Sequence, residues 1–115
     1  VSCWDAFAGA KGDPGDERTI TKRFSEAIGG RVALVSTGSI WTESDAEFVI
    51  DQGADVIGVA RAAIGNADWA NNLGGGDYEP ERPPFTPDHL LEEGLSPVFI
   101  DYMRRWQGFV SDGRK

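Results

Sequence analysis

The sequence predicts an α/β fold, because short apolar runs alternate with stretches that have helical spacing. The run at 31–35 follows a helical pattern at about 17–28, and the run at 56–59 follows a second one that starts at Thr42. Both runs are rich in valine, as strands buried on both faces of a parallel sheet are. Such alternation forms right-handed βαβ units.

The helix expected at about 17–28 has one apolar face. Ile20, Phe24 and Ile28 lie on that face at helical spacing, and Gly29 supplies a stop signal. The strand at 31–35 is expected to follow this helix directly.

The second helix is expected to begin after Thr42, whose side chain can cap it. Glu43 and Asp45 fall in its first turn, where the helix dipole favours each acid by about 0.3–1 kcal/mol. Gly53 is the expected end of this helix.

The alternation stops after one more short helix, for which Asn66 is the expected cap. Three glycines at 74–76 and a proline-rich stretch then follow. Beyond them, Thr86-Pro87 and Ser96-Pro97 each place a capping residue before a proline at the first helical position. We therefore expect residues 1–73 to form the α/β part, with 74–115 as a linker and helical extension of the same domain.

Composition excludes several classes of protein. The 115-residue chain has a formal net charge of -8 and a pI near 4.5, which argues against binding to nucleic acid. No apolar stretch reaches the roughly 20 residues that a membrane span needs. Cys3 and His89 are the only residues of their types, so we expect neither a disulfide nor a metal site. The composition suits a cytoplasmic protein.

Two successive predicted strands end in residues suited to an anion. Gly38-Ser39 follows the first strand and Ala60-Arg61 follows the second. Ligands of parallel α/β folds bind at the carboxyl ends of strands, where backbone amides and an arginine can hold phosphate oxygens. The alternative is a plain tight turn beside a solvated arginine, and spacing alone does not decide between them.

The chain also resembles the C-terminal part of the old yellow enzyme family of NADH:flavin oxidoreductases. The matching stretches are VALVSTGSI, TESDAEFVIDQGADV, IGVARAAI, NADW and the ending FTPDHLLEEGLSPVFIDYMRRWQGFV, with VSCWD at the start. The resemblance covers nearly the whole chain, and the order and spacing of these motifs are fairly specific.

This resemblance implies the C-terminal portion of a (β/α)8 TIM barrel, about strands 6 to 8, followed by two helices. It implies FMN as the cofactor, NADH or NADPH as the reductant and a small electron-poor substrate. Gly38 and Ser39 would give backbone amides to the FMN phosphate. Ala60 and Arg61 occupy the family's Gly-Arg pair, with the Arg61 side chain on the same phosphate.

One departure concerns Ala60, which stands where the family usually has glycine. If this position needs a left-handed backbone, alanine costs about 1–2 kcal/mol. The family's residues for the flavin ring and for proton donation lie upstream of the matched region. No catalytic residue is therefore assigned, and the chain alone is expected to be inactive.

Two other functions stay open from the sequence. One is another phosphate-binding TIM-barrel enzyme, and the other is a non-catalytic half-barrel that binds phosphate or assembles with itself. In the expected arc of strands both outer edges are bare, and bare edges recruit other chains. We therefore expect a homo-oligomer, or association with the missing half of the barrel.

Overall fold

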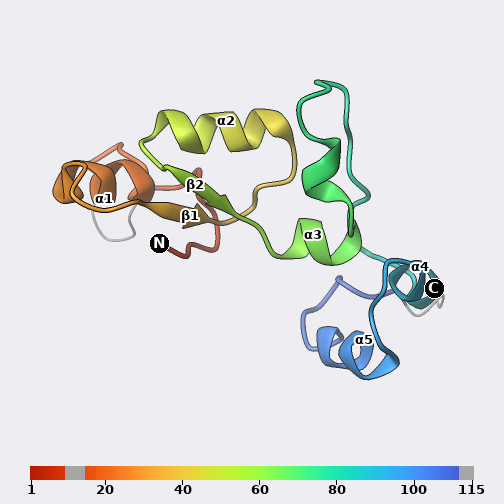
Figure 1. Ribbon diagram of the computed structural model, residues 1–115. Coiled ribbons are helices and arrows are strands. Elements are labelled where there is room, and N and C mark those ends of the chain that lie inside the picture. Colours follow the sequence, from red (N-terminus) through yellow and green to blue (C-terminus); the bar gives the residue numbers. More distant parts are fainter. Residues whose placement is uncertain (10–14, 112–115) are drawn as a thin grey trace. The chain divides into compact units, whose positions relative to one another are not determined.

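The computed structural model describes residues 1–9 and 15–111, and the chain forms two compact units. Unit 1 comprises Val1–Ala60 and unit 2 comprises Arg61–Lys115. The helices and strands of unit 1 are α1 (Ile20–Ile28), β1 (Val35–Thr37), α2 (Glu43–Asp51) and β2 (Val56–Gly58) (Figure 1). Those of unit 2 are α3 (Arg61–Gly65), the 3-10 helix η1 (Trp69–Asn72), α4 (Pro87–Glu92) and α5 (Pro97–Met103).

The sheet of unit 1 pairs β1 with β2 in parallel. Val35 lies opposite Val56, and Thr37 lies opposite Gly58. The connection between the two strands runs through α2, which lies along the strands in Figure 1. The expected alternation of strand, helix and strand is therefore present in this unit.

The prediction of a TIM-barrel portion is wrong. Within the described residues the molecule is a small mixed structure of five α-helices and one sheet of two three-residue strands. The segment at the start of the chain, expected to end a third strand, forms only an isolated bridge between Ser2 and Thr37. Barrel strands are covered on both faces, whereas the side chains of Val35 and Val56 are 44% and 50% exposed.

The strands are short because polar contacts replace regular pairing where they begin. The amides of Asp55 and Val56 both donate to the Leu34 carbonyl, at 2.8 and 3.1 Å. The Leu34 amide in turn donates to the Asp55 carboxylate at 2.8 Å. At 31–33, where a strand was expected, the Arg31 side chain instead donates to the last carbonyls of α1.

Helix α1 starts later than expected and turns a different face inward. Thr19 caps it by accepting a hydrogen bond from the Lys22 amide, and Gly29 ends it in the left-handed conformation with φ 62°. Phe24, expected on the buried face, is 47% exposed, whereas Thr21 is fully buried. The Thr21 hydroxyl lies 2.6 Å from the Ser36 hydroxyl of β1, so a polar pair joins this helix to the sheet.

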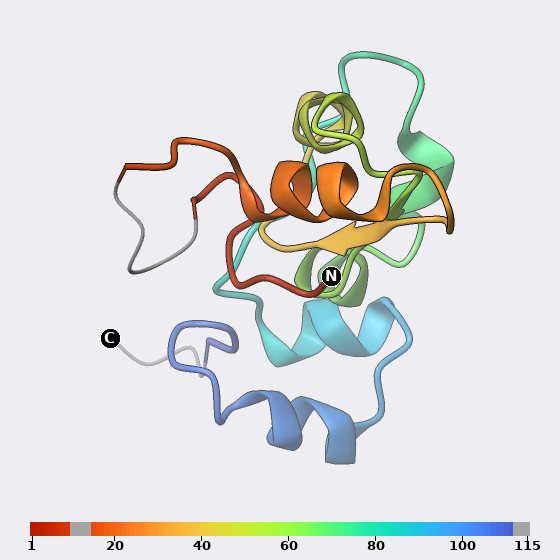
Figure 2. The same ribbon diagram turned by 90° about the vertical axis from the view of Figure 1, so that its left-hand side faces the viewer.

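Helix α2 begins as the sequence predicts. The Thr42 side chain accepts from the Asp45 amide while the Asp45 carboxylate accepts from the Thr42 amide, which is a complete capping box. The end of α2 lies beside α1 (Figure 2), where a Cβ atom on Gly53 would come within 2.1 Å of the Ser25 hydroxyl oxygen. Gly53 has φ 113°, so this position needs glycine for two reasons.

Unit 2 is organised around the buried ring of Phe85. The Phe85 ring meets the Phe109 ring edge to face at 5.2 Å, and the two segments form a parallel bridge. A Cβ atom on Gly65 would lie 2.1 Å from the Phe85 ring, so the last residue of α3 must be glycine. Leu90 of α4 and Met103 of α5 complete the core of this unit.

The expected caps of the last two helices are confirmed. Thr86 accepts from the His89 amide, and Ser96 accepts from the Phe99 amide. The expected cap at Asn66 is wrong, because the buried Asn66 side chain instead binds the backbone of Ala62 and Glu81. The following element is a 3-10 helix with Asp68 at its N-cap.

The buried hydroxyl pair gives a test of how α1 is held. Ser36→Ala or Thr21→Val should each lower the free energy of unfolding by about 1–3 kcal/mol, because the remaining hydroxyl loses its buried partner. The double variant should cost less than the sum of the two, since no hydroxyl is then left unpaired. Urea denaturation of the four proteins measures this; additive losses would mean that the hydroxyls do not interact.

Candidate anion site at the carboxyl ends of the strands

The register of the sheet brings three of the four predicted site residues to one edge. Gly38 and Ser39 follow β1 directly, and Ala60 comes two residues after the end of β2. Since Thr37 pairs with Gly58, both strands end at the same level. Arg61 is the next residue in the chain, the first of α3 and of unit 2.

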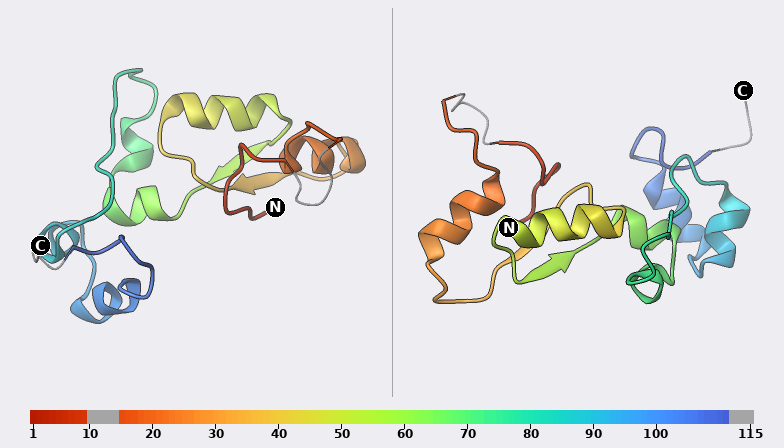
Figure 3. Two further views of the ribbon diagram at one scale, coloured as in Figure 1. Left: turned by 180° about the vertical axis from the view of Figure 1, so that it is seen from behind. Right: turned by 90° about the horizontal axis from the view of Figure 1, so that it is seen from above.

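Gly38 is buried against the chain's own N-terminal segment, which runs beside β1 (Figure 3). Its φ is 146°, and a Cβ atom there would lie 2.5 Å from the Cys3 carbonyl oxygen and 2.9 Å from the Ala6 nitrogen. The Gly38 carbonyl accepts a hydrogen bond from the Ala6 amide at 3.1 Å. The absence of a side chain at Gly38 therefore allows close contact with the backbone of Cys3 and Ala6.

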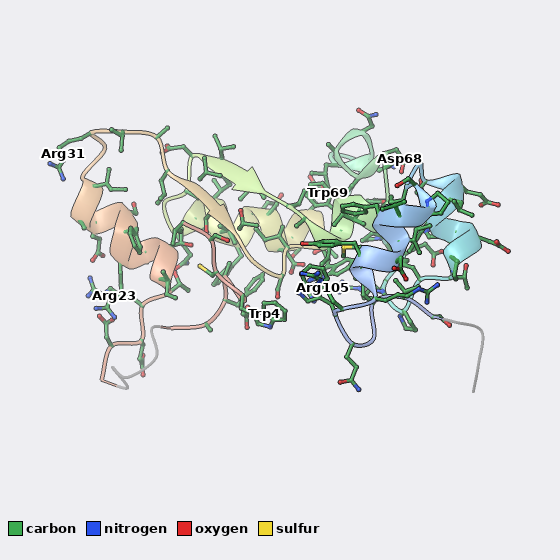
Figure 4. The ribbon with its side chains drawn as sticks, turned by 90° about the horizontal axis from the view of Figure 1, so that it is seen from below. Trp4, Arg23, Arg31, Asp68, Trp69 and Arg105 are labelled. Carbon is green, nitrogen blue, oxygen red and sulfur yellow. The ribbon has the colours of Figure 1, made fainter. Side chains whose placement is uncertain are left out.

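Ser39 has a strained backbone. Its φ of 56° is positive, which among the described residues other than glycine occurs here alone. A left-handed conformation costs a non-glycine residue about 1–2 kcal/mol, and such strain gathers at functional sites. The Ser39 hydroxyl donates to the carbonyl of Trp4 at 3.0 Å, and the Trp4 side chain is 73% exposed (Figure 4).

Ala60 is exposed, and its φ is not positive. The backbone penalty considered for alanine at this position therefore does not arise. The glycine that allows a close contact at this edge is Gly58, where a Cβ atom would lie 2.1 Å from the Thr37 side-chain oxygen. Sequence reasoning missed this role, although a glycine inside a run of valine and isoleucine often marks such a close approach.

The thiol nearest to the strand ends is a poor nucleophile. Burial raises the pKa of Cys3; the nearby N-terminal amino group opposes this shift and Asp5 adds to it. The thiol is therefore protonated near neutral pH, and only the thiolate is reactive. The described residues contain no group of three or more His, Cys, Asp and Glu side chains that could hold a metal ion.

A concave region away from the strand ends lies along α1 and the residues before it, with a volume of about 520 Å³. It is lined by Arg18, Arg23, Phe24, Glu26 and Ala27. Arg18 forms ion pairs with Asp16 and Glu26, and the hydrogen bonds from Arg18 hold the pKa of Asp16 well below its usual range. Because Arg18 already has two acidic partners, this region is a poor candidate for binding an anion.

His89 has a structural position in unit 2. The ring is partly buried and stacks on Phe85 at 5.5 Å. Its Nε2 donates to the Gly65 carbonyl at 2.7 Å, which ties α4 to α3.

Comparisons of the chain with protein-family models, with curated proteins and with solved structures found no match. The part of the chain that the structure describes also contains no helix long and apolar enough to cross a membrane.

A substitution at Gly38 tests the packing at this edge of the sheet. Gly38→Ala should lower the free energy of unfolding by about 1–3 kcal/mol or more, because the new methyl group would meet the Cys3 carbonyl in a strained backbone. Urea denaturation measures the change.

Two control variants separate the effect of the positive φ from the effect of steric contact at the new Cβ atom. Gly29→Ala has the positive φ but no atom within 4 Å of the new Cβ, and Gly75→Ala has neither constraint. The expected order of destabilisation is Gly38, then Gly29, then Gly75. Equal effects at Gly38 and Gly29 would mean that the N-terminal segment does not pack on this turn.

Proposed function

We propose that the chain contributes the FMN phosphate site of an FMN-dependent NAD(P)H oxidoreductase, at the carboxyl ends of β1 and β2. The observation that carries the proposal is the parallel register, which ends both strands at the Thr37–Gly58 pair. Ligands of open parallel sheets bind outside the carboxyl ends of the strands. The proposal does not require a barrel.

The residues at this edge fit a phosphate group better than they fit a flavin ring. Ser39 brings a strained turn and a hydroxyl group, and Ala60 leaves the second turn exposed. Arg61, next to Ala60, supplies the positive charge for a charge-assisted bond. Gly38 acts indirectly, because its lack of a side chain lets residues 3–6 hold the turn in place.

The resemblance to the old yellow enzyme family supports FMN over other phosphate compounds. When bound in such an enzyme, FMN accepts a hydride from NADH or NADPH and passes it to an electron-poor substrate. This chain's own residues would hold the phosphate end of that cofactor. We assign them no step in the hydride transfer.

Arg61→Ala should weaken FMN binding about ten- to a hundred-fold, because it removes a charge-assisted bond of about 1.5–3 kcal/mol. Riboflavin lacks the phosphate, so its affinity should stay the same. Fluorescence titration of the full chain with each compound measures both affinities.

Lys22→Ala is the control for this experiment, because it removes one positive charge from α1 rather than from the strand ends. If Arg61→Ala lowers the affinities for FMN and riboflavin equally, Arg61 does not bind the phosphate. If inorganic phosphate binds at the strand ends while neither flavin does, the site exists but the oxidoreductase assignment fails.

Ala60→Gly should leave the affinity for FMN unchanged. The backbone at Ala60 is already in a conformation open to alanine, so glycine relieves no strain. The same fluorescence titration measures this. A clear gain in affinity would mean that the methyl group crowds the bound phosphate, and a clear loss would mean that this turn does not correspond to the family's Gly-Arg pair.

A further inference from the structure

Helix α5 and the residues after it carry a surface of three aromatic rings and one arginine. Phe99 and Tyr102 lie 5.7 Å apart, and Tyr102 meets Trp106 edge to face at 5.2 Å. Phe99 and Tyr102 are 40% and 46% exposed, while Ile100 on the other side of the helix is buried. We call Phe99, Tyr102, Arg105 and Trp106 the α5 aromatic surface.

Arg105 is held on this surface but has no acidic partner there. Its guanidinium carbon lies 4.3 Å from the centre of the Tyr102 ring and 5.7 Å from that of Trp106. Among the described residues the Arg105 guanidinium forms neither an ion pair nor a hydrogen bond, whereas the side chain of neighbouring Arg104 lies 3.6 Å from Asp101. A guanidinium stacked on rings keeps its N–H groups available at its edge, in the geometry that binds a carboxylate.

Unit 2 also carries a group of acids that matches this surface in charge. The Glu93 carboxylate accepts a hydrogen bond at 3.4 Å from the amide of Ala67, the residue before Asp68, and also lies 3.8 Å from the His89 ring nitrogen. Burial raises the pKa of Tyr78, and the carboxylates of Asp68, Glu93 and Glu81 raise it further. The backbone of Glu81 is fixed by two hydrogen bonds with the buried side chain of Asn66. We call Asp68, Glu81 and Glu93 the acidic patch.

We propose that the α5 aromatic surface of one copy docks on the acidic patch of a second copy. Asp68 and Arg105 lie well apart on unit 2 (Figure 4), and among the residues that the structure describes the Arg105 side chain has no acidic partner. A second copy supplies the missing carboxylate beside Tyr78, an aromatic residue that can pack on the exposed rings. Tyrosine, tryptophan and arginine are the side chains that most often dominate the binding energy of interfaces. This inference does not depend on the proposed flavin function.

The dependence of self-association on salt is the first test. The chain has a net charge of -8, so overall repulsion between copies would weaken as salt is added. Docking through Arg105 and the acidic patch instead predicts that association weakens as salt is added. Analytical ultracentrifugation should show a dimer at low salt that dissociates between about 0.05 and 0.5 M NaCl, as the local attraction is screened.

Charge exchange is the sharper test. Arg105→Glu and Glu81→Lys should each weaken self-association by about tenfold or more, because each variant places like charges opposite one another. An equimolar mixture of the two variants should associate again, since both contacts of the mixed dimer then pair opposite charges. Lys22→Glu and Glu47→Lys are the controls, which change the net charge equally on α1 and α2 and should have no comparable effect.

Three results would overturn the proposal. The first is a chain that stays monomeric at about 0.1 mM. The second is an association that strengthens with salt. The third is a mixture of Arg105→Glu and Glu81→Lys that associates no better than each variant alone, with circular dichroism showing that both are folded.

Discussion

The clamp between Leu34 and Asp55 is the contact on which the architecture of unit 1 depends. The Leu34 carbonyl accepts two amides from the start of β2, and the Asp55 carboxylate accepts the Leu34 amide. These bonds fix the register, and the register decides that β1 and β2 end at the same edge. A shift of one residue would turn Ser36 away from Thr21 and would separate the two turns that form the candidate site.

Two glycines, Gly38 and Gly58, determine how closely neighbouring atoms pack at that edge of the sheet. The N-terminal segment can cross the end of β1 only because Gly38 has no side chain, and Gly58 leaves room for the Thr37 hydroxyl beside β2. The strained Ser39 is held by its neighbours on both sides, through Gly38 and through the hydrogen bond to the Trp4 carbonyl. A turn fixed in this way needs little reorganisation when it meets an anion, which lowers the cost of binding.

Several acidic residues of this chain stabilise local structure. Asp45 caps α2, Asp55 holds the register, Asp5 accepts the Phe7 amide, and Asp16 pairs with Arg18. A protein with a net charge of -8 can attract an anion or a carboxylate only where a cation is placed by its neighbours. For this reason the positions of Arg61 and of the stacked Arg105 matter more for the two proposals than the overall composition does.

The sequence by itself determined the features that depend on neighbours three or four residues apart. The caps at Thr42, Thr86 and Ser96, the stop at Gly29 and the parallel order of strand, helix and strand could all be read from local patterns. Capping is local, because a side chain bonds an amide three residues further on. The grouping of Gly38, Ser39 and Ala60 at one edge also follows from the parallel order alone.

The tertiary structure alone decided how far each strand extends and which side chains are buried. Runs of valine predict a strand, but they do not reveal that Asp55 limits its length or that Val35 and Val56 are half exposed. Helical spacing placed Phe24 inside, whereas the structure buries Thr21 because the Ser36 hydroxyl lies opposite it. The spacing of residues shows that one face of a helix is apolar. Whether that face is buried depends on the element that packs against it.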